Sequence, residues 1–169
     1  ASLIIATTLL LDGYTLEDFG IESINLNPND YCNLTDVDYE AILYDNPNGK
    51  ANVLITEYLT FDVHASSMSN TFKELWRELP EDVVDGLRVT YDVISVTQIL
   101  ADGTEIPYKE TSKMYWDDSD YTKNSTMYWH HSTGSGMYPD NDESLLIYIP
   151  WTYREKMTFK IIYSLNNAA

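Results

Sequence analysis

Residues 53–63 constrain the fold of this chain more than any other segment. Apolar side chains take every second position, at Val53, Ile55, Leu59, Phe61 and Val63, and polar residues fill most places between them. This period of two is that of a half-buried β-strand, whose successive side chains point to opposite faces of a sheet. Glu57 stands in the apolar register, where an ionised carboxylate is costly unless it is paired. The segment therefore predicts a sheet with one buried face and an acid that needs a partner.

Other segments repeat the strand signal between turn residues. A strand is predicted at residues 37–44. The turn residues Asn46-Pro47-Asn48-Gly49 connect it to the strand at 53–63, which predicts a hairpin. A second hairpin is predicted where residues 87–100 meet Asp102-Gly103. Further strands are predicted at residues 145–149 and 157–165. Together they predict an all-β, antiparallel β-sandwich, immunoglobulin-like in general architecture and with at most short helices.

Residues 70–79 fit two structures equally well. Phe72, Leu75, Trp76 and Leu79 have helical spacing, yet Phe72 and Trp76 also alternate with glutamates as in a strand. Pro80 ends the segment in either case. Helix and strand both remain open here, whereas residues 115–142, rich in Asp, Ser, Asn and aromatics, predict a long loop region.

A chain of 169 residues fits one domain with a full core. We expect a β-sandwich domain at 36–169, preceded at 1–35 by an apolar and polar N-terminal segment or tether. Residues 1–11 carry no charge and are too short to span a bilayer, which takes about 20 residues. They are either a buried strand or the remnant of a signal sequence.

Charge limits the partners. The chain has 10 basic and 27 acidic residues, a formal net charge of -17, which repels nucleic acid and anionic lipid. Cys32 is the only cysteine, so no disulfide forms within the chain. No cofactor is predicted.

Glu57 and Arg77 are the first candidate site. A carboxylate on an inward face requires a donor, and Arg77 is the cation next to Trp76. A bidentate pair would satisfy both groups. We expect a structural ion pair rather than a catalytic acid, because no second carboxylate or nucleophile accompanies it in the sequence.

Two weaker constellations involve metals. His130 and His131 could bind a transition metal with the nearby acidic cluster, but neighbours on an extended chain point to opposite sides. The acidic cluster, which also invites a calcium interpretation, comprises Asp117, Asp118 and Asp120. An exposed histidine pair and solvated turns are the favoured interpretations, so no metal is predicted.

Aromatic residues of the loop region form the last candidate site. Rings that are not used in the core could make a platform for sugar or peptide. The candidate ligand-binding residues are Tyr115, Trp116, Trp129, His130 and Tyr138.

Four short segments carry a resemblance to a known protein family. They lie at residues 39–41, 55–61, 75–80 and 158–163. In order and spacing they are similar to the extracytoplasmic β-domain of a bacterial predicted-membrane-protein family, the domain of unknown function 2207. Its members carry a V-T-E strand, an aromatic-Arg-x-x-Pro segment and a closing T-Y-x-I-x-Y strand. The resemblance implies export by an N-terminal signal, a β-sandwich outside the membrane and, in many members, a transmembrane anchor elsewhere in the protein. It implies no activity.

Three functions follow as hypotheses. The first is a non-enzymatic, extracytoplasmic interaction or sensing module of a bacterial cell envelope, membrane-associated through a tether outside this chain, with an unknown protein or glycan as its partner. The alternatives are a carbohydrate- or peptidoglycan-binding module and, least favoured, a metal-dependent hydrolase.

Overall fold

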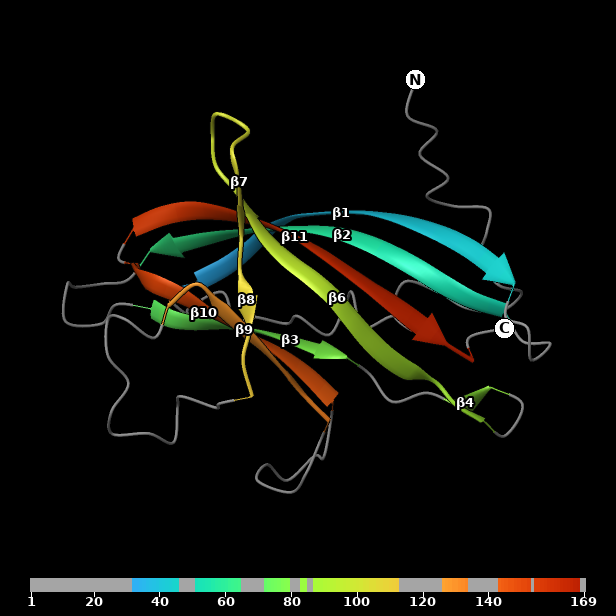
Figure 1. The fold of residues 1–169 in the computed structure, drawn as a ribbon. Helices are drawn as coiled ribbons and strands as arrows, with labels where there is room; N and C mark the ends of the chain where they lie inside the picture. Colours follow the sequence, from blue (N-terminus) through green and yellow to red (C-terminus); the bar gives the residue numbers. More distant parts are fainter. Residues whose placement is uncertain are drawn as a thin grey trace.

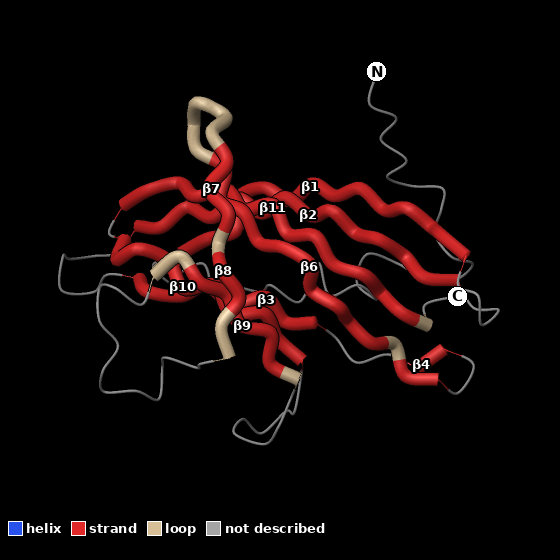
Figure 2. Tube along the Cα trace, in the orientation of Figure 1, coloured by secondary structure: helices blue, strands red, loops and turns tan. Residues whose placement is uncertain are grey.

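The computed structural model describes residues 32–45, 51–64, 72–79, 83–84, 87–112, 126–133, 143–152 and 154–167. The strands are β1 (Cys32–Asp45), β2 (Ala51–His64), β3 (Phe72–Leu79), β4 (Val83–Val84), β5 (Leu87–Arg88), β6 (Thr90–Ile99), β7 (Glu105–Pro107), β8 (Lys109–Glu110), β9 (Tyr128–Ser132), β10 (Glu143–Thr152) and β11 (Arg154–Asn166). Within these ranges there is no helix (Figure 2).

Two sheets form a β-sandwich (Figure 1). Sheet A has five strands in the order β1-β2-β11-β6-β7, and sheet B has four in the order β3-β10-β9-β8. All pairings within them are antiparallel except that of β8 with β9. The predicted all-β antiparallel sandwich is thus confirmed, and the short ribbon β4-β5 lies apart from both sheets.

Strand β1 begins at Cys32, inside the stretch that the sequence assigned to a tether. Leu34 packs against the core, and Thr35 forms a bulge, since Leu34 pairs with Phe61 and Asp36 already pairs with Thr60. The hydroxyl of Thr35 donates to the carbonyl oxygen of Thr60 at 3.2 Å. The apolar contact of Leu34 thus places residues before the predicted domain start, at residue 36, in the sandwich.

Residues 72–79 are a strand, which decides between the two predicted alternatives. Leu75, Arg77 and Leu79 are buried, and β3 pairs with β10 along most of its length. Helical spacing and strand alternation coincide over so short a segment, and the neighbouring strand selects the second.

The loop predicted for residues 115–142 is wrong at residues 128–132, which form β9. This strand pairs with β10 from Tyr128↔Tyr148 to Ser132↔Ser144. Polar composition and nearby turn residues concealed it, because a central position between β10 and β8 does not depend on local sequence. Residues 113–125 and 134–142 lie outside the described ranges.

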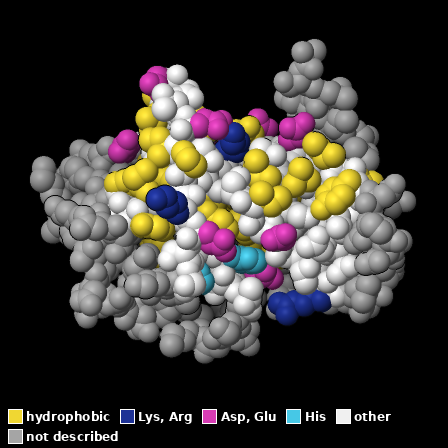
Figure 3. Space-filling model, viewed as in Figure 1, with side chains coloured by type: hydrophobic (Ala, Val, Ile, Leu, Met, Phe, Trp, Pro, Cys, Tyr) yellow, Lys and Arg dark blue, Asp and Glu magenta, His cyan; other side chains and the backbone are white. Residues whose placement is uncertain are grey.

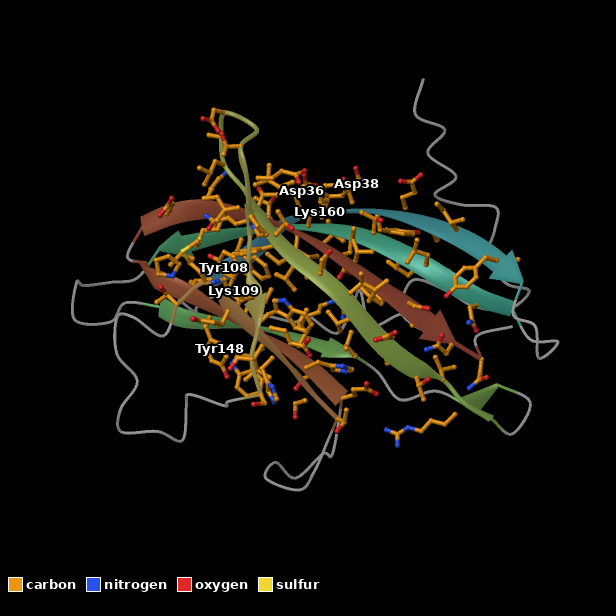
Figure 4. All side chains as sticks on the ribbon, viewed as in Figure 1. Asp36, Asp38, Tyr108, Lys109, Tyr148 and Lys160 are labelled. Atoms are coloured by element: carbon orange, nitrogen blue, oxygen red, sulfur yellow. The ribbon has the colours of Figure 1, made fainter. Side chains whose placement is uncertain are left out.

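The chain passes from sheet A to sheet B at Tyr108 (Figure 4). The amide of Tyr108 donates to Val96 of β6 at 2.9 Å, and the next amide, that of Lys109, donates to Met127 beside β9 at 3.1 Å. The hydroxyl of Tyr108 donates to Oε1 of Gln98 at 2.9 Å, and its ring packs edge-on against Phe159 with centroids 5.5 Å apart. Tyr108 therefore joins one corner of the sandwich to the core.

The inner faces of the sheets make the core. Leu59, Phe159, Leu145 and Ile149 have no exposed surface, and Phe61 meets Phe159 in an edge-on contact at 6.4 Å. Burial of each such side chain contributes about 1.5–3 kcal/mol to folding. The alternation of residues 53–63 and 157–165 thus places one face of β2 and β11 inside, as predicted.

The predicted hairpin at Asp102-Gly103 closes with a three-residue loop. The amide of Gly103 donates to Leu100 at 2.9 Å, and the amide of Leu100 donates to Thr104 at 2.9 Å. Gly103 has φ of 84°, and Oδ1 of Asp102 accepts from the amide of Thr104 at 2.9 Å. This is a turn followed by a left-handed residue, which favours glycine.

We predict that Gly103→Ala lowers the free energy of unfolding by about 1–2 kcal/mol, because an alanine is strained at this φ. No heavy atom lies within 4 Å of the added Cβ, so the loss would come from backbone strain alone. Gly103→Asn should cost less, since asparagine tolerates left-handed geometry. Urea unfolding of both variants measures this, and an equal loss for the two would contradict it.

Candidate functional site

Glu57 and Arg77 form a fully buried ion pair, as the sequence predicted. Their side chains are 0% and 1% exposed. Nη2 of Arg77 donates to Oε1 of Glu57 at 3.0 Å, and Nε donates to Oε2 at 3.2 Å and to Oε1 at 3.3 Å. Both carboxylate oxygens therefore accept from one guanidinium in a two-point contact.

The pair joins the two sheets. Glu57 lies on β2 of sheet A, between Tyr39 of β1 and Ile161 of β11. Arg77 lies on β3 of sheet B, opposite Leu145 of β10. Each residue occupies the inward register of its strand, so the charges meet across the sandwich. Strand alternation in two separate segments is what aims them at one another.

Two tyrosines of sheet A adjoin the pair. Tyr163 on β11 is entirely buried, and its hydroxyl accepts a hydrogen bond from Arg77. Burial alone would lower the pKa of Arg77, but the charge of Glu57, with contributions from Tyr163 and Tyr91, outweighs it. The net pKa of Arg77 lies above its ordinary value. The guanidinium of Arg77 is therefore charged near neutral pH.

The pKa of Tyr163 is raised. Burial is the main cause and the negative charge of Glu57 adds to it, while Arg77 offsets part of the rise. Burial also raises the pKa of Tyr108, and Glu155 contributes in the same direction. Both hydroxyls remain protonated near neutral pH, so Tyr163 serves the ion pair as a neutral acceptor.

This arrangement is suited to holding two sheets together rather than to acid catalysis. A catalytic carboxylic acid needs a substrate within hydrogen-bond reach and a pKa near the working pH. Both oxygens of Glu57 already accept from Arg77, and the pair is closed to solvent. The geometry therefore supports the predicted structural role.

The sequence predicted that His130 and His131 form an exposed pair in a loop. This prediction is wrong, because both residues are half-buried in β9. Nδ1 of His130 lies 2.8 Å from the carbonyl oxygen of Thr111, to which it must donate. Nε2 of His131 lies 2.5 Å from Oε1 of Glu143. The two imidazoles sit on opposite faces of the strand and make separate contacts, so they do not converge on one site.

Trp129 does not belong to an exposed aromatic platform. It is 4% exposed and part of the core, opposite Ile147 of β10. Trp129 was misplaced for the same reason that β9 was missed, because pairing with β10 turns alternate residues of β9 inward. The remaining candidate ligand-binding and metal residues lie outside the described ranges: Tyr115, Trp116, Asp117, Asp118, Asp120 and Tyr138.

Sequence reasoning missed a row of apolar side chains on the outer face of sheet A. The outer apolar row consists of Ile42 on β1, Leu54 on β2, Ile162 on β11 and Ile94 on β6. Ile42 pairs directly with Leu54, and Ile162 pairs with Ser95, the neighbour of Ile94. The signal was present, because Leu54 and Ile162 both interrupt the polar register of alternating strands.

The outer apolar row is open to solvent at both ends. Ile42 is 51% and Ile94 is 55% exposed. The ring of Tyr44 reaches across β2, since its hydroxyl lies 2.7 Å from Oγ of Ser164 on β11. Figure 3 shows hydrophobic side chains gathered over the right half of sheet A, with acidic side chains along the upper rim.

No protein-family model matches the chain, and no curated protein matches it by sequence. The resemblance to the domain of unknown function 2207 therefore stays a prediction. Among the residues that the structure describes, no helix is long and apolar enough to cross a membrane, and no three His, Cys, Asp or Glu side chains gather as metal ligands do.

We predict that Glu57→Ala lowers the free energy of unfolding by about 3–5 kcal/mol, because it leaves a buried guanidinium without its counter-charge. Glu105→Ala is the matched control. Glu105 is exposed and pairs with Lys160 at 2.6 Å, an interaction worth less than about 1 kcal/mol. Denaturant unfolding compares them, and equal losses would show that the buried pair is not needed. The double variant Glu57→Leu/Arg77→Met should recover most of the loss, since it removes both charges.

A further prediction concerns alkaline pH. The pKa of Tyr163 and of Tyr108 is higher in the folded chain than the ordinary value of 10.0. Their contribution to stability is thus complete below about pH 10 and is lost as pH rises through the folded values. We expect the free energy of unfolding to fall above about pH 10, and less steeply in Tyr163→Phe. Unfolding at a series of pH values from about 9 to 11 measures the slopes, and identical slopes would refute the role of Tyr163.

Proposed function

We propose that this chain is a non-enzymatic interaction module that acts outside the membrane of a bacterial cell envelope. The outer apolar row, Ile42, Leu54, Ile94 and Ile162, is the observation that carries the proposal. In this reading sheet A offers its outer face to a partner protein, while the buried pair Glu57–Arg77 and the core between the sheets keep that face in shape.

The outer apolar row supports binding because of its position. One residue of the outer apolar row lies on each of four neighbouring strands. Leu54 and Ile162 are diagonal neighbours, since Leu54 pairs with Ser164 and Ile162 with Thr56. Contiguous apolar surface on a soluble domain marks a contact site more often than scattered single residues do. Polar residues border it, with Glu40 exposed on one side and Asp92 on the other. An apolar centre with a polar rim is the usual anatomy of a protein interface.

The proposed location rests on sequence. The apolar residues 1–11 have the composition of the end of a signal sequence. The resemblance to the domain of unknown function 2207 adds export and membrane association. A formal net charge of -17 also favours protein partners over nucleic acid or anionic lipid.

Photo-crosslinking tests the proposal. A photoreactive amino acid is placed at position 94 and, as a matched control, at Met127, which is 38% exposed and adjoins sheet B. Each chain is incubated with a solubilised cell-envelope fraction of the source organism and irradiated. We expect one discrete adduct from position 94 that is lost when Ile42→Lys is introduced into the same chain, and no such adduct from position 127.

Ile42 and Ile94 are exposed, so these changes should leave the fold intact, with an effect on stability within about 0.5 kcal/mol. Circular dichroism and thermal unfolding verify this. The absence of an adduct at position 94, or the same adducts at both positions, would overturn the proposal.

A further inference from the structure

Strand β1 is the longest edge strand among those the structure describes. It has 14 residues and borders sheet A, with β2 as its neighbour. On the opposite side of sheet A, β7 has three residues, ends in Pro107 and pairs with only the last three residues of β6. The rest of β6 contains a bulge at Ile94. An edge strand directs alternate backbone N–H and C=O groups away from its sheet, where another chain can pair with them. The opposite edge is broken by a short strand, a proline and a bulge, whereas β1 pairs with β2 without interruption from Asp36 to Asp45.

Beyond the bulge at Thr35, β1 is regular. Its pairing with β2 runs without interruption from Asp36↔Thr60 to Asp45↔Ala51. Side chains alternate along this stretch. Asp36, Asp38 and Glu40 lie on the outer face, and Val37 and Ala41 pack against the core. An uninterrupted run of this kind provides a template for a further strand, whose side chains would follow the same alternation.

The outer face of β1 is acidic. Asp36, Asp38 and Glu40 are all exposed, and Asp36 and Asp38 lie along the rim of the molecule (Figure 4). Lys160 lies on the same face of the sheet, but it pairs with Glu105 at 2.6 Å, toward β7 and away from β1. An added strand would place its own outward side chains directly opposite these carboxylates, where like charges are destabilising and opposite charges contribute.

This charge pattern selects the occupant. Pairing of β1 with β1 of a second copy along the acidic stretch brings carboxylates together, and the whole chain carries a net charge of -17. A basic segment gains a favourable charge interaction at each of the same positions. The acidic stretch is followed by Ile42, Leu43 and Tyr44, all exposed. These residues offer apolar contacts to an occupant that carries apolar side chains at the corresponding end.

We propose that β1 accepts an extended, basic segment of another protein as an additional strand of sheet A. The segment alternates Lys or Arg, opposite Asp36, Asp38 and Glu40, with apolar residues that continue the inner face. In the antiparallel direction, apolar residues opposite Tyr44 and Ile42 precede the basic ones. This inference rests on the proposed function, since it names the chemistry of the partner and the way it binds.

A synthetic peptide with this pattern tests the proposal on the full chain. It carries apolar residues opposite Ile42 and Tyr44 and three lysines opposite the acids, and fluorescence anisotropy measures its binding. We expect saturable binding that weakens by about tenfold or more when the lysines are replaced by glutamates. Asp38→Asn should weaken binding of the lysine peptide. Asp92→Asn, which removes the same charge from the exposed face of β6, should not.

Backbone pairing gives a readout that charge attraction alone does not. N-methylation of alternate peptide residues gives two variants. Methyl groups on the amides that face β1 should abolish binding, and methyl groups on the other amides should preserve it. Hydrogen exchange of alternate amides between Asp36 and Tyr44 should slow on addition of the peptide. Equal binding of the two N-methylated variants, or unchanged hydrogen exchange along β1, would overturn strand addition.

The remaining outcomes are also decisive. Self-association of the chain through β1, measured by sedimentation and abolished by Ile42→Lys, would replace the basic segment by a second copy and overturn the proposal. Failure of the peptide while the adduct at position 94 persists would refute strand addition and leave the proposed function standing. Loss of the adduct alone would refute the function of the outer apolar row, not the binding of the peptide.

Discussion

The ion pair between Glu57 and Arg77 is the contact on which the placement of one sheet on the other depends. A sheet-on-sheet core is held mainly by burial of apolar surface, which does not by itself fix how one sheet is placed on the other. A buried charge pair does, because its desolvation is repaid only when donor and acceptor meet in good geometry. Here the pair joins β2 to β3, and Tyr163 of β11 accepts a further hydrogen bond. Three strands in two sheets are therefore tied to one polar contact.

The two faces of sheet A differ in their exposure to solvent. The inner face carries Glu57, Tyr163 and the large apolar residues of the core, and it is closed. The outer face carries the outer apolar row and the acidic stretch of β1, and it is open. Because successive residues of a strand point to opposite sides, one sequence encodes both faces at once. A rigid inner face keeps the outer one in a fixed arrangement, which would lower the entropic cost of binding the proposed partner.

Much of the fold could be predicted because its signals are local. Alternation marked β2 and β11, and turn residues marked the hairpins at residues 46–49 and 102–103. Glu57 was recognised as a buried acid from its register alone. Trp129 was misassigned, because its neighbours in sequence are polar and its burial comes from β10, which lies further along the chain. Residues 72–79 were undecided for a similar reason, since the partner strand and not the periodicity selects their structure.

The sequence by itself determined which residues of β2 and β11 face inward, that Glu57 needs a donor, and that the chain is strongly acidic. These properties follow from side-chain alternation and composition, which do not require knowledge of distant contacts. Only the tertiary structure decided that Arg77 crosses from the other sheet, that Trp129 and His131 are held by β10, and that β1 is an edge. Each of these depends on pairing between segments far apart in the chain, and strand pairing is selected by the packing of whole faces rather than by local propensity.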